Sequence, residues 1–169
     1  MIETDRLVLR KPVPEDAAAF APLLADPVVM HFIGGVDDAE TAVARWLDRW
    51  EANGVGHFVI VRRADGLVLG RSGFVVWDTS VWRATTRAEA GEHVQEELGW
   101  MLGRAHRGQG YATEAARAAR AWAAIPGLIS LIDPVNTASQ RVAERLGCTR
   151  GDRVVLESGV PCDVWLHPG

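Results

Sequence analysis

The chain has 169 residues, of which 48% are hydrophobic and 24% charged, and its formal net charge is −4. This balance is typical of a globular protein with one core, so we expect a single domain over residues 1–169. The sequence has no basic block that would indicate a nucleic-acid partner and no apolar run near the roughly 18 residues of a membrane span. It begins without a signal-peptide pattern, and Cys148 and Cys162 therefore fit reduced thiols in the cytoplasm.

Hydrophobic periodicity predicts an α/β mixture along the chain. We expect strands at residues 6–10, 57–62, 67–77, 95–102, 128–132, 153–157 and 163–167. We expect helices at residues 15–24, 39–52, 111–124 and 136–146. Pro22 leaves the end of the first helix open, and Asp65-Gly66 marks a hairpin between the second and third strands. The polar segment 78–94 has no clear pattern and is expected to be a long functional loop.

A glycine turn is the most informative part of the sequence. Residues 107–114 read Arg-Gly-Gln-Gly-Tyr-Ala-Thr-Glu, after an apolar strand and at the start of an alanine-rich helix. The first N–H groups of a helix have no partner within it and lie at the positive end of the helix dipole. Gly108 and Gly110 carry no Cβ, so a phosphate can approach the backbone. The turn therefore predicts a phosphorylated cofactor, and the lack of a following Lys-Ser or Lys-Thr excludes a Walker-type NTPase.

Several stretches in a fixed order carry a resemblance to one family. They are residues 4–10, 97–102, 107–115, 136–139 and 144–147. Together they resemble the GCN5-related N-acetyltransferases (GNAT), and in particular the ribosomal-protein N-terminal acetyltransferases. The resemblance implies one α/β domain with a mixed, mostly antiparallel central sheet, a splayed pair of strands and helices on both faces. It also implies an enzyme that moves an acetyl group from acetyl-CoA to a primary amine by direct transfer in a ternary complex.

The same resemblance implies where acetyl-CoA binds. The pantetheine amides would pair with the backbone of Trp100, Met101 and Leu102, in the gap between this strand and the strand 128–132. The pyrophosphate would lie on the loop and helix start formed by Arg107, Gly108, Gln109, Gly110, Tyr111, Ala112 and Thr113. Asn136 and Ser139 would line the thioester end, and Arg145 would contact the phosphate of the adenosine.

Acetyl transfer to an amine requires a neutral amine and a donor for the negative charge that develops on the carbonyl oxygen. Strand alternation places Glu97, Gly99 and Met101 on one face, where the missing side chain of Gly99 leaves room for a substrate. We expect Glu97 to act as the base, directly or through water; the alternative is that it only pairs with a surface arginine. For the carbonyl we expect a backbone N–H near Met101, where the family has a bulge.

The leaving thiolate needs a proton or a hydrogen-bond donor, and here the chain departs from a common family pattern. Many members have a tyrosine at the position of Ala143, and the only tyrosine of this chain is Tyr111, within the phosphate loop. A tyrosine acid at the usual position is therefore excluded. Ser139 is the expected donor instead, unless it only caps or solvates the start of a helix.

The acceptor is expected to be a small-molecule amine or the α-amine of a peptide. Trp77, Trp82 and Gly99 are candidates for lining its site, with Trp82 notable because it lies in a polar segment. We also expect the segment 78–94 to set acceptor choice. No metal is expected, because the five histidines are scattered, and the sequence allows a monomer or a homodimer.

Two other classes fit parts of the sequence. A dinucleotide-binding oxidoreductase would use Gly108 and Gly110 as the start of a G-x-G-x-x-G fingerprint, but Thr113 occupies the third glycine position and only one βαβ unit is predicted. A non-catalytic acyl-CoA-binding module would share the fold and would explain the missing tyrosine.

Overall fold

The computed structural model describes residues 1–34 and 37–169. The strands are β1 (Ile2–Glu3), β2 (Leu7–Arg10), β3 (His57–Arg62), β4 (Val68–Asp78), β5 (Arg83–Thr85), β6 (Val94–Leu102), β7 (Ile129–Ile132), β8 (Thr149–Val155) and β9 (Pro161–Leu166). The helices are α1 (Asp16–Leu24), α2 (Pro27–Met30), α3 (Ala39–Asn53), α4 (Arg87–Ala90), α5 (Tyr111–Ala123) and α6 (Thr137–Arg145), and the 3₁₀ turns are η1 (Gly91–His93) and η2 (Arg104–His106). Every strand and helix that the sequence predicts is present within a few residues of its expected bounds.

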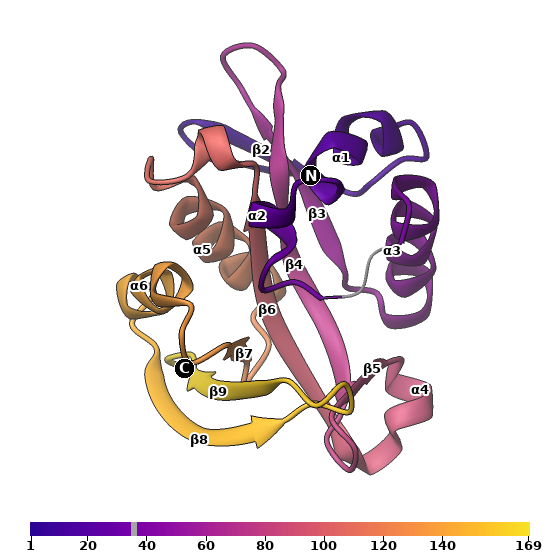
Figure 1. Ribbon diagram of the computed structural model, residues 1–169, viewed down its shortest axis with the longest axis vertical. Helices are drawn as coiled ribbons and strands as arrows, with labels where there is room; N and C mark the ends of the chain where they lie inside the picture. The colour runs from indigo at the N-terminus through magenta and orange to yellow at the C-terminus, as the bar shows by residue number, and fades with distance from the viewer. Residues whose placement is uncertain (35–36) are drawn as a thin grey trace.

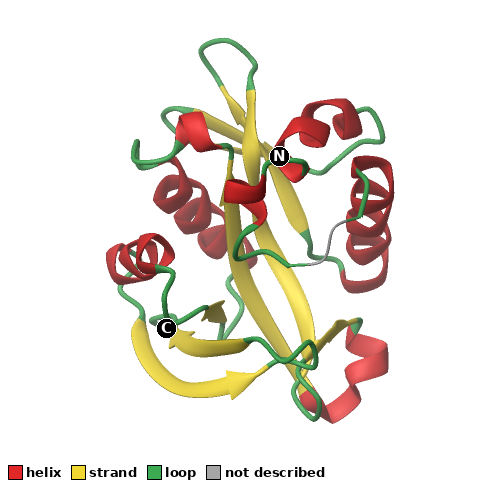
Figure 2. Ribbon diagram, in the orientation of Figure 1, coloured by secondary structure: helices red, strands yellow, loops and turns green. Residues whose placement is uncertain are grey.

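The described strands form one open sheet in the order β1-β2-β3-β4-β6-β7-β9-β8, with β5 added beside β4. Figure 2 shows this sheet running through the molecule with helices on both sides. Among the described strands, only β6 and β7 are neighbours that run parallel, and one residue pair, Glu97 with Ile129, joins them. The fold is thus the expected α/β domain with a mixed, mostly antiparallel sheet and one splayed pair of strands.

Helices α1 and α3 cover one face of the sheet and α5 covers the other (Figure 1). On the α1 and α3 face, Phe20 meets Trp46 edge to face at 4.8 Å and packs in one cluster with Val59 and Met101. On the α5 face, fully buried alanines of the helix, among them Ala115 and Ala119, let its backbone approach the leucines and aromatic rings of the sheet. The two faces of β6 therefore have different surroundings, as strand alternation requires.

Helix ends follow from local sequence. Asp38 caps α3 by accepting a hydrogen bond from the N–H of Thr41, and Gly54 ends this helix in the left-handed conformation. Helix α1 continues through Pro22, because a proline in the last turn removes one backbone hydrogen bond without blocking the residues after it. The short elements β1 and α2 were not predicted, since two to four residues carry too little periodicity.

The segment 78–94 is not the long loop that the sequence predicts. It contains β5, α4 and η1, and β5 pairs with β4. Thr86 caps α4 by accepting from the N–H of Glu89, and the Glu89 carboxylate accepts from the N–H of Thr86 in return. This reciprocal capping box, with Thr and Glu three residues apart, was the available signal in the sequence.

Three features of the described residues concern the cysteines, metal ligands and membrane spans considered in the sequence. Cys148 and Cys162 are free thiols, as expected. Within the described ranges, no cluster of three potential metal ligands occurs. None of the helices described here has both the length and the apolar character needed to cross a bilayer.

Candidate active site

The parting of β6 and β7 is fixed by a small polar network at its closed end. The hydroxyl of Ser130 on β7 donates to the carbonyl oxygen of Leu98 on β6 at 2.5 Å, and Nε2 of His167 lies 2.9 Å from the same hydroxyl. Arg120 approaches Nδ1 of His167 at 3.4 Å, and burial followed by the Arg120 charge lowers the pKa of His167 to about 4. A neutral ring that donates from Nε2 and accepts at Nδ1 satisfies all three contacts.

Beyond this point the backbone of β6 faces an open gap. The carbonyl oxygen of Leu98 meets β7, and that of Leu102 accepts from Nε of Arg107 at 3.2 Å. The carbonyl oxygen of Met101 points the other way: a Cβ atom added to Gly70 of β4 would lie 2.0 Å from it. Because successive residues of a strand alternate, the backbone groups of Trp100 share the side of Leu98 and Leu102 and face the gap.

The bulge expected near Met101 is absent, which corrects the sequence-based expectation. Strands β4 and β6 pair in continuous register from Gly70 with Leu102 to Asp78 with Val94. Gly70, with a φ of +154° and no side chain, lets the two backbones approach closely without a bulge. The described register shifts lie elsewhere, in β3 between Ile60 and Val61 and in β8 between Arg150 and Arg153. Without a bulge, the N–H of Met101 is directed to β4 rather than to the gap.

The glycine turn lies at the open end of the gap and begins α5. Gly108 and Gly110 have φ values of +75° and +82°, and no described side chain caps the helix start. The N–H groups of the first turn are therefore free to bind an anion. The Oγ1 atom of Thr113 in this turn is buried without a hydrogen-bond partner among the described residues, which leaves a further polar atom for a ligand.

Side-chain contacts hold the glycine turn in place without covering its backbone. Glu114 accepts from Nε of Arg6 at 2.7 Å and from the hydroxyl of Thr4 at 2.6 Å, which ties α5 to the N-terminal strands. Tyr111 is buried in the core under the Arg6 guanidinium, 4.5 Å from its ring centroid. Gln109 donates to the carbonyl oxygen of Ala105 at 3.1 Å. These contacts use the side chains and leave the backbone exposed.

The gap, the glycine turn and the opposite face of β6 open into one cavity of about 1110 Å³. Most of the predicted site residues line it: Trp77, Glu97, Gly99, Trp100, Met101, Leu102, Arg107, Gly108, Gly110, Tyr111, Ala112, Thr113, Asn136, Ser139 and Arg145. Gln109 and Trp82 are not among the lining residues. Arg141 of α6, which sequence reasoning did not select, lines the same wall as Arg145.

Glu97 lies where β6 and β7 part. Its Oε2 accepts from Nε1 of Trp77 at 2.7 Å, and its Oε1 accepts from the N–H of Leu131 at 3.4 Å. In the described part of the chain no arginine or lysine forms an ion pair with Glu97, so the alternative of a surface pair is not what the structure shows. Burial raises the pKa of Glu97 and outweighs the hydrogen bond from Trp77, which lowers it. A partly buried carboxylate with a raised pKa is a stronger base than an exposed one.

Ser139 lies across the gap on the first turn of α6. Its hydroxyl oxygen accepts from Nε1 of Trp100 at 3.3 Å, and this leaves the hydroxyl proton free for donation. The helix cap is Asn136, whose Oδ1 accepts from the N–H of Ser139 at 3.1 Å. Capping therefore does not account for the Ser139 side chain, and the Asn136 oxygen is already engaged.

The other end of the cavity is formed by residues that the sequence did not reveal as a group. Trp46 and Arg49 come from α3, His57 from β3 and Arg71 from β4. The signal available in the sequence was the alternation of side chains along a strand. His57 and Arg71 lie on the same face of the sheet as Val59, Gly73 and Met101. A positive and a titratable side chain on a buried strand face are unusual enough to mark a site.

The segment 78–94 contributes to this end mainly through its backbone. The carbonyl oxygens of Ala84 and Thr85 accept from Arg49, and Ala84 lines the cavity. Trp82 has a φ of +51°, and its carbonyl oxygen accepts from the N–H of Glu157 in the β8–β9 hairpin. Its contribution to an acceptor site stays a prediction.

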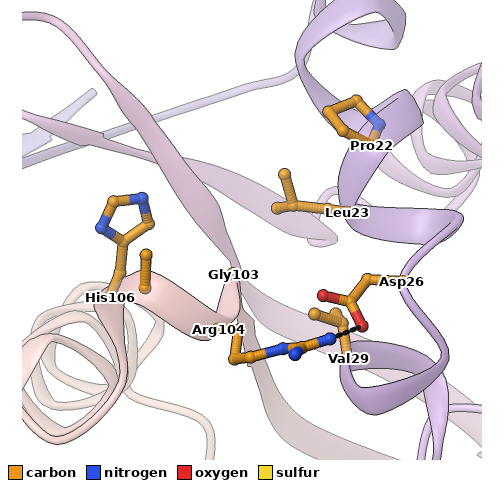
Figure 3. A pocket seen from close by; sticks show the side chains of 8 residues that line it. Pro22, Leu23, Asp26, Val29, Gly103, Arg104 and His106 are labelled. Atoms are coloured by element: carbon orange, nitrogen blue, oxygen red, sulfur yellow. Dashed lines mark hydrogen bonds and ion pairs between the residues drawn. The ribbon is translucent and has the colours of Figure 1, made fainter.

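A second, smaller hollow of about 280 Å³ lies between α1, α2 and η2. Figure 3 shows Asp26 and Arg104 joined across it by an ion pair, for which the distance is 2.7 Å, with Gly103 directly before Arg104 in the chain. None of the predicted site residues lines this hollow. The large cavity is therefore the candidate active site.

Comparisons with known proteins identify the family of the chain. The model of the acetyltransferase (GNAT) domain matches residues 6–149. The uncharacterised protein YkkB of Bacillus subtilis (strain 168) is 33% identical over 153 residues, which are 85% of this chain and 82% of that protein. The crystal structure of an acetyltransferase from Agrobacterium tumefaciens is 28% identical, with a TM-score of 0.79 over 99% of this chain and 94% of that chain.

Structures at lower identity share the fold and were solved with a ligand. A microcin self-immunity acetyltransferase, MccE, in complex with acetyl-CoA and AMP is 16% identical, with a TM-score of 0.71 over 97% of this chain and 92% of that chain. An aminoglycoside acetyltransferase and a ribosomal alpha-N-protein acetyltransferase, RimL, both in complex with coenzyme A, are each 15% identical. Their TM-scores are 0.73 and 0.74, over 95% and 97% of this chain and 94% of each of theirs. Because the domain model matches most of its length, this chain belongs to the GNAT family of acetyltransferases.

Proposed function

We propose that this chain moves an acetyl group from acetyl-CoA to a primary amine by direct transfer in a ternary complex, with residues 1–169 acting as one N-acetyltransferase domain. One observation carries the proposal. A single cavity contains an open strand edge, an uncapped helix start and a carboxylate with a raised pKa at the point where two strands part. Acetyl-CoA supplies the acetyl group in activated form, as a thioester.

The residues present fit that donor. The backbone of Trp100 and Leu102 offers hydrogen-bonding groups to the pantetheine amides in the manner of an added strand. The N–H groups that begin α5, with the Thr113 hydroxyl, suit the pyrophosphate. Arg141 and Arg145 of α6 place positive charge on the same wall for the remaining phosphate.

Glu97 is the proposed base. An amine becomes nucleophilic only after it loses its proton, and the Glu97 carboxylate receives this proton directly or through one water. The amine nitrogen then forms a bond to the acetyl carbon as the bond from that carbon to sulfur breaks, and the proton that the nitrogen loses on becoming an amide is taken up by the departing thiolate. Gly99, on the same strand face as Glu97, leaves the space through which an amine can approach.

Two donors serve the developing charges. The N–H of Trp100 faces the gap and takes the role that the expected bulge would have given to Met101, whose side chain packs in the core. The hydroxyl of Ser139 donates to the departing sulfur, since its acceptor side is already held by the Trp100 indole. The pair compensates for the tyrosine replaced by Ala143.

Two alternatives are weaker. A non-catalytic acyl-CoA-binding module would not need a base at the closed end of the gap, and Glu97 occupies that point without an ion-pair partner among the described residues. A dinucleotide-binding fold needs several adjacent parallel strands, whereas β6 and β7 are the one parallel pair of the described sheet.

The acceptor class is the finer part of the proposal. The solved relatives in fold include enzymes named for an aminoglycoside and for a ribosomal protein α-amine, so both small-molecule and peptide acceptors are compatible with the fold. The ribosomal-protein branch, the cytoplasmic location and the choice between monomer and homodimer stay proposals. So does the influence of segment 78–94 on acceptor choice.

The test is thiol release from acetyl-CoA with a panel of primary amines and of peptides with free N-termini, combined with calorimetry of acetyl-CoA binding. We expect binding and turnover with at least one amine class. Tight binding without transfer to any amine would contradict the proposed reaction and favour the binding module. No binding would contradict the assignment of the gap as the donor site.

A further inference from the structure

Arg71 is the feature of the cavity that the proposed reaction does not use. It lies on β4, lines the acceptor end and is partly buried there. Its Nε is buried without a hydrogen-bond partner, and its only side-chain hydrogen-bond contacts among the described residues are from one terminal nitrogen to the ring nitrogens of His57, at 2.9 and 3.2 Å. No described carboxylate pairs with it. A guanidinium in this position is short of hydrogen-bond acceptors.

His57 cannot neutralise Arg71. Burial, and then the charge of Arg71, hold the pKa of His57 well below its ordinary value, so the ring is neutral. One ring nitrogen then carries a proton, and only the other can accept from Arg71. Trp46 fixes the arrangement from the other side, with its ring 5.8 Å from His57 and 5.3 Å from the Arg71 guanidinium carbon. Burial lowers the pKa of Arg71 to about 10, so the guanidinium keeps its charge at neutral pH.

The neighbouring arginines are already engaged. Arg45 pairs with Asp37 at the rim, and Arg49 donates to the carbonyl oxygens of Ala84 and Thr85. Both line the cavity and add positive potential to its acceptor end without competing for the same partner. Among the described residues, Arg71 is therefore the cation at this end whose guanidinium has no oxygen acceptor.

Arg71 and Glu97 share one face of the sheet with a glycine slot between them. Arg71 lies opposite Met101, Gly73 lies opposite Gly99, and Val75 lies opposite Glu97 in the register of β4 and β6. Gly99 lines the cavity, and an added Cβ there would meet only Oε1 of Glu97, at 3.7 Å, so the sheet beside the carboxylate is open to a ligand. The charges of Glu97 and Arg71 also act on each other's pKa, although they form no ion pair.

We propose that the acceptor is an amine that carries a carboxylate, of the α-amino acid type, whose carboxylate binds Arg71 while its amine lies at Glu97. This rests on the proposed acetyltransferase function. A carboxylate supplies oxygen acceptors to a guanidinium, which Arg71 lacks among the described residues. A phosphate would call for more donors than Arg71 offers, since Arg45 and Arg49 are held by other partners.

The experiment compares thiol release for matched acceptors at saturating acetyl-CoA. Each proteinogenic amino acid is assayed beside its primary amide and its decarboxylated amine, together with peptides that have free N-termini. For the preferred amino acid we expect kcat/KM at least about 10-fold higher than for its amide, the size expected for a charge-assisted hydrogen bond. Equal or faster turnover of amides, decarboxylated amines or peptides would overturn the proposal.

Variants of Arg71 locate the effect. Arg71→Gln should bring the acid-to-amide ratio close to one, mainly through a higher KM for the acid, and Arg71→Lys should restore part of the ratio. Arg63→Gln is the matched control, because Arg63 is exposed near the β3–β4 hairpin and donates only to the carbonyl oxygen of Thr4. If Arg71→Gln lowers acid and amide turnover equally, its role is structural and the proposal is wrong.

A binding measurement separates this inference from the proposed reaction. Calorimetry of an amino acid and its amide, in the presence of coenzyme A, reports on the anion site even if no amine is acetylated. If the chain binds the acid more tightly than the amide and Arg71→Gln abolishes this difference, the anion site is supported. This holds even if no turnover is seen, a result that would contradict only the proposed reaction. Lack of preference, or a preference that persists in Arg71→Gln, would overturn the inference.

Discussion

The two ends of the cavity are built in different ways. The donor end uses backbone groups of one nearly continuous stretch, from β6 through the glycine turn to α5. The acceptor end uses the side chains of Trp46, His57, Arg71 and Glu97, which come from one helix and three strands. Recognition by backbone groups depends little on side-chain identity and suits a ligand that all members of a family bind. Recognition by side chains suits a ligand that differs between members, because single substitutions can alter it. Within this fold, we therefore expect topology to fix the proposed donor end and substitutions to change the proposed acceptor end.

The largest effect is expected from a variant that impairs the acceptor end and leaves the donor end intact. Glu97→Gln keeps the size and the contacts with Trp77 but removes the base, so kcat should fall by about 10²- to 10⁴-fold while the affinity for acetyl-CoA is unchanged. The wild-type rate should fall in acid as Glu97 is protonated, with its apparent pKa above the ordinary glutamate value because burial raises it. Steady-state kinetics across pH and calorimetry measure both quantities.

The same variant has a stability signature of known sign. Burial raises the pKa of Glu97 in the folded chain above its unfolded value, so stability falls as pH rises through that interval. Glu97→Gln removes this loss, and its Tm above neutral pH should equal or exceed that of the wild type. Glu96→Gln, on the opposite strand face and paired with Arg87, is the control that should keep turnover. Full turnover of Glu97→Gln would refute the assignment of the base.

A smaller effect is expected from a variant that impairs the donor end and leaves the acceptor end intact. Gly108 has a φ of +75° with no atom within 4 Å of an added Cβ, so Gly108→Ala introduces backbone strain and no clash. Strain of about 1–2 kcal/mol in the turn should raise the KM for acetyl-CoA by about 10-fold and leave the acceptor KM unchanged.

Gly66→Ala is a closely matched control for this prediction. Gly66 has a φ of +73°, also with no atom within 4 Å, but it lies in the β3–β4 hairpin away from the cavity. Both variants should lose similar stability by thermal denaturation. If both raise the KM for acetyl-CoA, the effect is one of stability and the turn is not the phosphate site.

The smallest effect is expected from a variant of Ser139, the proposed donor to the departing thiolate. Ser139→Ala should lower kcat by about 3- to 10-fold, the range for one neutral hydrogen bond, with little change in either KM. Ser139→Thr keeps the hydroxyl and should retain most of the rate. Thr149→Ala, at an exposed position of β8 outside the cavity, should leave the rate unchanged. Full activity of Ser139→Ala would show that the thiolate departs without this donor.

The sequence predicted the elements that form the proposed donor end because their information is local. The glycine turn, the helix it begins and the shared face of Glu97, Gly99 and Met101 follow from neighbouring residues and a strand period of two. The bulge at Met101 was predicted wrongly because a bulge depends on the partner strand. Here Gly70 of β4 allows close approach in continuous register.

The acceptor end could not be predicted because its residues meet only after the sheet forms. His57 and Arg71 are paired through the register of β3 and β4, which no single segment specifies. The structure in segment 78–94 was missed for a different reason: the capping box of Thr86 and Glu89 was present in the sequence but encloses only four helical residues.

The parting of β6 from β7 also has a consequence for the energetics of the whole molecule. An unpaired strand edge is usually found at the border of a sheet, where it can attract other chains, but here it lies in the interior, between two strands of the same sheet. A ligand that pairs with this edge acts as a removable strand. Its binding adds directly to the free energy of unfolding, by about 2.7 kcal/mol at a concentration 100 times its Kd. With acetyl-CoA as the proposed ligand, the stability of the fold would therefore rise and fall with the concentration of acetyl-CoA in the cell.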